Sequence, residues 1–252
     1  MRRPALTLAV LPLLALGLAA CGDDDSGAGD GGSGGGSGTG SSSTRDYRDT
    51  PIDEIGEDVE EAMDSLETVH LAGNFIDDED QKILMDVTVS RSGDCQGSMT
   101  IEGVGSMEII SVGGASYFKA DDAFWQSQGG DQASVITGLI GDKWTTDSTD
   151  PEGFAELCDL DELLSELSSD DVAGDGSKVT GTQDVGGKET VTVSFTSDDG
   201  NSGTAYVAAD DPHYLLRMDV REEGAMGFSR FDEPLDVQKP ADAEIFDLAS
   251  LG

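Results

Sequence analysis

The chain has 252 residues, and its 52 acidic side chains against 14 basic ones give a formal net charge of −38. A surface of this charge repels nucleic acid and anionic lipid headgroups, which argues against nucleic acid as a partner and against membrane attachment through a basic patch. The length suffices for one domain with a hydrophobic core.

Residues 1–20 are predicted to be a secretory signal peptide. A positively charged start and an apolar run from Pro4 to Leu18 lead through small residues into Cys21. The run is shorter than the roughly 20 apolar residues of a membrane-spanning helix, and it stops at an acidic segment. We therefore expect cleavage rather than the alternative, an uncleaved anchor.

The order Leu18-Ala19-Ala20-Cys21 resembles the lipobox of bacterial lipoproteins. The resemblance implies a diacylglyceryl group, with chains such as palmitate, in thioether linkage to Cys21. It also implies cleavage before this cysteine and a location at the cell membrane, on the extracytoplasmic face. Two acyl chains hold a protein stably at a membrane, whereas a single chain binds only marginally.

Residues 21–50 are predicted to be a flexible tether, because their Gly, Ser, Thr and Asp residues offer almost nothing to bury. The folded domain is expected over residues 51–252. Lipidation of Cys21 leaves Cys95 and Cys158, and an exported protein favours a disulfide between them over two separate buried thiols. Neither cysteine has further ligands at metal-site spacing, so we expect no zinc and no cofactor.

The periodicity of apolar residues predicts how the domain begins. Apolar residues recur every three or four positions from Ile52 to Leu66, which indicates an amphipathic helix with Thr50 as its N-cap. From Val69 to Lys119 the period is two, and tight connections separate five short strands. Such a pattern predicts an antiparallel meander.

The segment from Asp121 to about Ser168 interrupts the strands. Its first part suits a short helix packed on the sheet, followed by Trp144 in a linking segment. Asp150-Pro151 then resembles a helix start, and the leucine stripe that follows fits one helix, or two that are broken near Cys158.

Strands resume at Lys178, with a hairpin turn at residues 198–201, and the tail from Pro240 to Leu251 is expected to form a last turn of helix. The fold class is therefore α+β, with a large curved, mostly antiparallel sheet packed on two or three helices. Several strands have a polar second face, so only one face of the sheet should be covered.

This order of elements, together with the lipobox, resembles actinobacterial envelope lipoproteins of the LppX/LprG type. The residues that carry the resemblance are Val69-His70-Leu71, Ser116-Tyr117-Phe118-Lys119, Trp125, Trp144, Thr204-Ala205-Tyr206-Val207 and Pro212-His213-Tyr214-Leu215-Leu216-Arg217. The resemblance implies a LolA/LolB-like half-barrel, an open sheet curved around an apolar cavity with helices as its lid. Some members of this group hold lipid acyl chains there. The chain departs from the pattern in its expected disulfide and its acidity.

The sequence contains few residues in patterns that are typical of catalytic sites. Only two histidines occur, and His70 within a strand and His213 after a turn both fit structural or exposed positions. No Gly-x-Ser-x-Gly motif stands between a predicted strand and a predicted helix, the sequence has no phosphate loop, and its acidic turns miss the calcium-ligand spacing. We therefore expect no catalytic residue, no metal and no enzyme activity.

The remaining candidate site is apolar. Its candidate cavity residues are Ile83, Met85, Val87, Met99, Ile101, Ile109, Trp125, Val191, Val193, Phe195, Met218 and Phe228. They either form an ordinary filled core or line a cavity that takes irregular chains, for which flexible methionines are suited.

The function predicted first is that of a monomeric, lipid-anchored lipoprotein that binds or carries a hydrophobic small molecule or lipid. The alternative is an interaction or sensor module with a filled core and an acidic partner-binding surface.

Overall fold

The computed structural model describes residues 46–76, 80–146, 156–165, 172–174, 176–196 and 200–251. The predicted signal peptide, Cys21 and most of the predicted tether lie outside these residues, as do Asp150-Pro151 and the centre of the turn at 198–201. No helix among the described residues is long and apolar enough to span a membrane.

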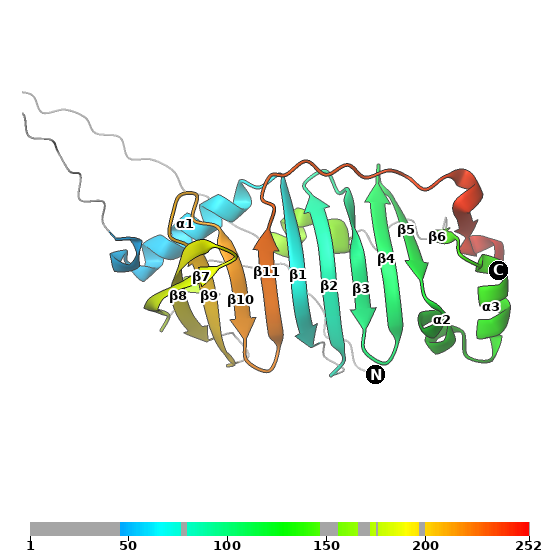
Figure 1. The fold of residues 1–252 in the computed structure, drawn as a ribbon, viewed down its shortest axis with the longest axis horizontal. Helices are drawn as coiled ribbons and strands as arrows, with labels where there is room; N and C mark the ends of the chain where they lie inside the picture. Colours follow the sequence, from blue (N-terminus) through cyan, green and yellow to red (C-terminus); the bar gives the residue numbers. More distant parts are fainter. Residues whose placement is uncertain are drawn as a thin grey trace, which may run out of the picture. The chain divides into compact units, whose positions relative to one another are not determined.

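Twelve strands of the described residues form one sheet, in the order β12-β6-β5-β4-β3-β2-β1-β11-β10-β9-β8-β7 (Figure 1). The strand bounds are β1 Thr68–Ile76, β2 Lys82–Ser90, β3 Cys95–Ile101, β4 Gly105–Val112, β5 Ala115–Ala120, β6 Trp144–Thr146, β7 Lys178–Val185, β8 Lys188–Thr196, β9 Ser202–Ala208, β10 Leu215–Val220, β11 Gly224–Ser229 and β12 Ile245–Asp247. Neighbours pair antiparallel except β12 with β6, which pair parallel.

The predicted meander from Val69 to Lys119 is confirmed as β1 to β5, and the second set of strands as β7 to β11. The two sets meet where β1 pairs with β11, with Leu71 opposite Phe228. Because β1 also pairs with β2, one central strand joins two antiparallel halves into a single sheet.

Helix α1 (Ile52–Asp64) confirms the predicted amphipathic helix. The predicted N-cap is wrong: Pro51 occupies that position without a side-chain cap, and Thr50 ends the preceding 3-10 helix η1 (Tyr47–Asp49). The N–H of Thr50 donates to the carbonyl of Tyr47 instead. The Tyr47 ring stacks on His213 at 3.7 Å, which fastens this entry segment to the connection between β9 and β10.

The insert after β5 has more elements than the sequence pattern predicts. Helices α2 (Asp122–Gly129) and α3 (Ala133–Ile140) follow β5, and Trp144 begins β6 rather than lying in a plain linking segment. The leucine stripe is broken at Asp159, between η3 (Glu156–Cys158) and α4 (Leu160–Ser165).

The tail also contains more than the predicted helical turn. The 3-10 helices η4 (Asp242–Glu244) and η5 (Leu248–Leu251) flank β12, which adds to the sheet edge beside β6. Both β6 and β12 have three residues, too few for an alternating pattern to show.

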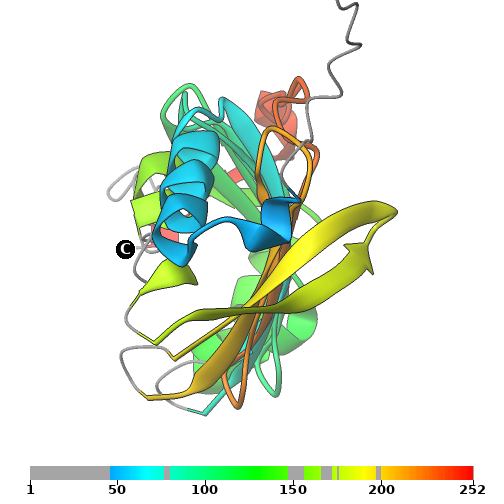
Figure 2. The same cartoon turned by 90° about the vertical axis from the view of Figure 1, so that its left-hand side faces the viewer.

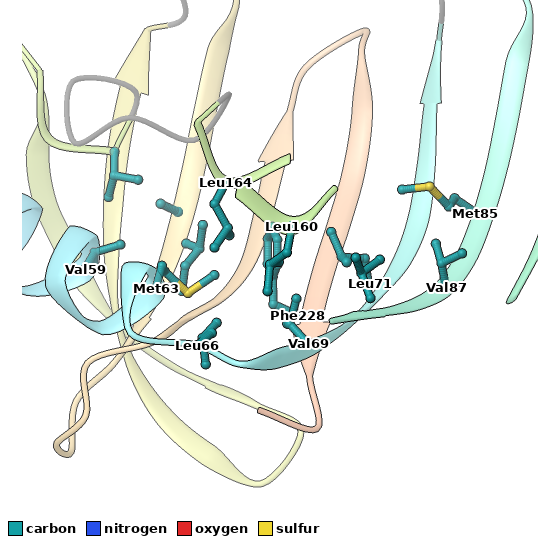
Figure 3. Packing of buried hydrophobic residues seen from close by; sticks show 14 of the residues in the cluster. Val59, Met63, Leu66, Val69, Leu71, Met85, Val87, Leu160, Leu164 and Phe228 are labelled. Atoms are coloured by element: carbon teal, nitrogen blue, oxygen red, sulfur yellow. The ribbon is translucent and has the colours of Figure 1, made fainter. Parts of the chain in front are cut away.

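Alternation along the strands gives the sheet two unlike faces. We call the face that bears Leu71, Val87 and Phe228 the core face and the opposite one the outer face. Helices α1 and α4 cover the core face, where Val59 and Met63 of α1, Leu66 just after it, and Leu160 and Leu164 of α4 lie over strand residues (Figure 3). Figure 2 shows α1 on one side of the sheet and the tip of the β7–β8 hairpin reaching out on the other.

The 3-10 helix η3, which leads into α4, is linked covalently to the sheet. Cys158 forms a disulfide with Cys95 at the start of β3, with a Cα–Cα distance of 5.4 Å, so the predicted pairing is present in the structure. Both cysteines are buried.

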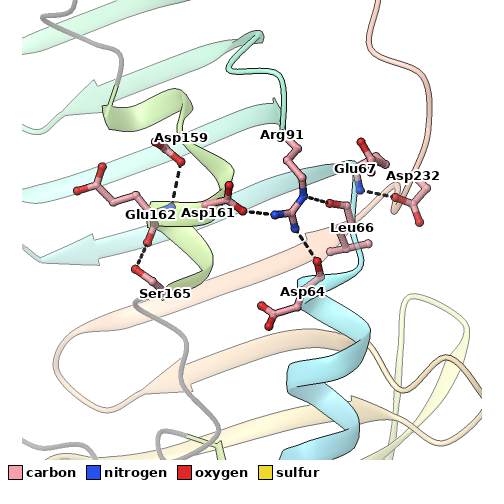
Figure 4. A network of polar contacts seen from close by, with 9 residues as sticks. All are labelled: Asp64, Leu66, Glu67, Arg91, Asp159, Asp161, Glu162, Ser165 and Asp232. Atoms are coloured by element: carbon pink, nitrogen blue, oxygen red, sulfur yellow. Dashed lines mark hydrogen bonds and ion pairs between the residues drawn. The ribbon is translucent and has the colours of Figure 1, made fainter. Parts of the chain in front are cut away.

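A polar clamp holds α4 beside α1. The Arg91 guanidinium donates to the carbonyls of Leu66 at 2.9 Å and Asp64 at 2.6 Å, and it forms an ion pair with Asp161 of α4 (Figure 4). A cation that bonds the last carbonyls of a helix also favours the helix dipole. One side chain therefore ties the β2–β3 turn to both covering helices.

Candidate ligand-binding face

A row of methionines crosses the core face at one level of the sheet. Met85 of β2 lies opposite Met99 of β3, which in turn lies opposite Met107 of β4. In the other direction Met85 lies opposite Gly73, Gly73 opposite Met226, and Met226 opposite Met218. Because directly opposed residues share a face, five methionines and one glycine form a continuous row over six strands.

Gly73 at the centre of the row is required by the close approach of β11. A Cβ atom built on it would lie 2.1 Å from the carbonyl oxygen of Ala225 and 2.8 Å from the Cα of Met226. These are backbone atoms, so a side chain could enter only if the two strands moved apart. The glycine thus allows close pairing and leaves the middle of the row without a side chain.

The structure places most of the predicted cavity residues in one buried cluster. Its members from that prediction are Ile83, Met85, Val87, Met99, Ile109, Val191, Val193, Phe195 and Phe228. Ile101 and Met218 are partly buried against the same cluster, whereas Trp125 belongs to a second cluster with Phe118 and Ile140. The structure therefore brings all of them except Trp125 together.

The cluster is densely filled beneath the helices. Ile55 and Leu66 of the α1 segment are fully buried, and Leu160 of α4 is 1% exposed. This part of the core face has the character of an ordinary domain interior, because its apolar strand side chains have apolar helix side chains against them.

The row reaches solvent at one end, through an apolar groove of about 120 Å³. Phe75, Met218, Val220 and Met226 line it, and Glu223 stands beside them. Small-molecule sites are commonly about 300–1,000 Å³, so the groove has room for part of a ligand, such as the end of a chain. The cavity residues predicted from the sequence include Met218 but not Phe75, Val220 and Met226. These three meet only through the register of β1, β10 and β11.

His70 lies on the outer face and has polar partners on both sides. Its Nδ1 is 3.0 Å from the Ser229 hydroxyl, and its Nε2 is 2.9 Å from a carboxylate oxygen of Asp86. The order of groups resembles a nucleophile, a base and an acid, but the Asp86 side chain is 68% exposed, so water screens its charge. We interpret these contacts as cross-strand bonds that satisfy a buried imidazole.

Comparison with solved structures identifies the fold of this chain. No protein-family model and no curated protein matches the chain. Among solved structures, LprF from Mycobacterium bovis is 17% identical, with 75% of this chain and 97% of that chain covered and a TM-score of 0.54. The Mycobacterium tuberculosis lipoprotein LppX is also 17% identical, with coverages of 74% and 98% and a TM-score of 0.47. The likeness to LprF shows that this chain has the same fold, and the predicted fold class is confirmed.

Proposed function

We propose that this chain is a lipid-anchored envelope lipoprotein that binds the acyl part of a hydrophobic ligand along the methionine row, without catalysis. The observation that carries the proposal is the row itself, five methionines at one level, of which Met218 and Met226 line an apolar groove that is open to solvent. Methionine is unbranched and polarisable, so such a row can accommodate chains of irregular shape.

The binding energy is expected to come from burial. Each methylene moved from water into an apolar site contributes about 0.8 kcal/mol, so six methylenes contribute about 5 kcal/mol before the cost of ordering the chain. Longer insertion requires side chains of α1 or α4 to move, because the groove alone is small. Glu223 at the groove and the net charge of −38 favour a neutral or zwitterionic headgroup over an anionic one.

Lipid extraction would test this proposal. Protein purified from its own host is extracted with organic solvent, and the extract is analysed by mass spectrometry. A Met226→Asp variant, which places a charge in the groove, is expected to retain at most a tenth of the ligand. The matched control is Leu84→Asp, because Leu84 lies on the outer face and is 45% exposed; it should retain the wild-type amount. Equal retention by both variants would place any bound lipid elsewhere.

The anchor is tested on the mature protein. The N-terminal peptide is expected to begin at Cys21 and to carry the added mass of a diacylglyceryl group. An unmodified Cys21 in membrane-associated protein would contradict the lipobox assignment, whatever the core face binds.

The filled core beneath α1 and α4 favours a second candidate function, an interaction or sensor module. In that case the domain would have no cargo, and its acidic surface would bind a cationic partner. Wild-type protein from its own host that yields no stoichiometric lipid would favour this module.

A further inference from the structure

A second and larger hollow lies on the opposite side of the sheet from the methionine row. Ala72 and Gly227 form part of its floor, and both belong to the outer face because they neighbour Leu71 and Phe228 along their strands. One wall is the tip of the β7–β8 hairpin, which reaches out on this side in Figure 2. The volume of this outer groove is about 520 Å³, within the usual range of small-molecule sites.

An aromatic pair forms another wall of the outer groove. The rings of Tyr214 and Phe231 stack at 4.1 Å with an angle of 12° between their planes. The chain turns sharply here, because Arg230 and Asp232 both have positive φ values, 51° and 56°. Asp232 secures the turn by accepting from the N–H of Glu67 at 2.8 Å and donating its own N–H to the carbonyl of Thr68 at 2.9 Å.

Two cations line the same groove, and neither lies within 4.0 Å of a carboxylate of the described residues. The ammonium of Lys188 lies 5.5 Å from the centre of the Phe231 ring, and Arg230 follows β11 directly. Across the described residues, the ion pairs of lysine and arginine within 4.0 Å are those of Arg48, Arg91, Arg217 and Lys239. Two cations that share one groove with an aromatic wall offer a place for an anionic group beside a flat ring.

We propose that the outer groove binds a small monoanion with a flat aromatic body. The body lies against Tyr214 and Phe231, and the anionic group, a carboxylate or a sulfonate, lies between Lys188 and Arg230. Glu233 also lines the groove, and the Asp232 carboxylate accepts from the Tyr214 hydroxyl at 3.4 Å, so more than one negative group on the ligand is disfavoured. The net charge of −38 repels polyanions such as nucleotides at long range. This site is separate from the proposed acyl site, because the two lie on opposite faces of the sheet.

The test uses 2-naphthoate as the probe and isothermal titration calorimetry of the full-length protein at low ionic strength. The wild type is expected to bind one equivalent, and a Lys188→Gln/Arg230→Gln variant at least tenfold more weakly. The control is Lys82→Gln/Arg221→Gln, which removes the same charge from two exposed positions outside the groove lining; its affinity should stay within twofold of wild type. Circular dichroism checks that each variant is folded.

Two further measurements test whether the ligand needs its negative charge and whether this site is independent of the acyl site. Neutral 2-naphthamide is expected to bind at least tenfold more weakly than naphthoate, and Met226→Asp should leave naphthoate affinity unchanged. The proposal is overturned if wild-type binding is not saturable, if the groove variant binds as tightly as the control, or if the amide binds as tightly as the acid. Loss of naphthoate binding in Met226→Asp would also overturn it, since binding would then depend on the core face.

Discussion

A Cys95→Ser/Cys158→Ser variant is expected to have a free energy of unfolding about 2–5 kcal/mol lower than the wild type. The bridge closes a loop of 63 residues, and the chain-entropy model assigns about 4 kcal/mol to a loop of that length. Both cysteines are buried, so their hydroxyl replacements would also need hydrogen-bond partners in an apolar setting. Helix α4 would then be held mainly by its leucines and the Arg91 ion pair.

Urea denaturation followed by circular dichroism measures this difference. The wild type in dithiothreitol is the matched control, because it lacks the bridge but keeps both side chains, and it should lose most of the same free energy. An unchanged unfolding midpoint in both samples would mean that the bridge adds nothing to the stability of the fold. A loss seen only in the serine variant would assign the effect to the buried hydroxyls.

Local alternation was sufficient to predict the two sets of strands, because apolar and polar residues alternate along most of them. It could not predict that Gly73 lies between Met85 and Met226, since these residues are distant in sequence and meet only through strand register. The outer groove could not be predicted from the sequence for the same reason. Its cations are Lys188 at the start of β8 and Arg230 after the end of β11, with β9 and β10 between these strands in the sheet, and neither stands in a recognisable motif.

The prediction of Thr50 as N-cap failed because the residues before it form a turn of their own. The Ser/Thr/Asp rule for helix starts assumes that the side chain turns back to the first free N–H groups. Here the preceding residues form their own 3-10 turn, and the backbone N–H of Thr50 closes that turn. Tyr47 holds the turn in place, with its hydroxyl donating to Asp58 of α1 at 3.0 Å. Tertiary packing of one aromatic residue thus outweighed a capping preference worth about 1 kcal/mol.

Replacing Leu160 by alanine is expected to lower the free energy of unfolding by about 2–5 kcal/mol, the usual cost of removing a fully packed leucine. Leu160 is 1% exposed and covers the core face from the first turn of α4, close to the disulfide at Cys158. The lost volume leaves a space over Leu71 and Phe228, in the region shown in Figure 3. Leu84→Ala on the outer face is the control and should change stability by less than about 0.5 kcal/mol.

The Leu160→Ala variant also tests whether the interior of the domain can take up an acyl chain. A ligand that binds only the folded state stabilises it by about 1.4 kcal/mol when present at ten times its dissociation constant. If chains enter along the methionine row, 1-decanol should stabilise Leu160→Ala more than the wild type, because the new space lets the chain insert without displacing α4. If decanol stabilises neither protein, the interior is closed to chains even when a leucine is removed. The carrier would then be excluded, and the interaction module would remain.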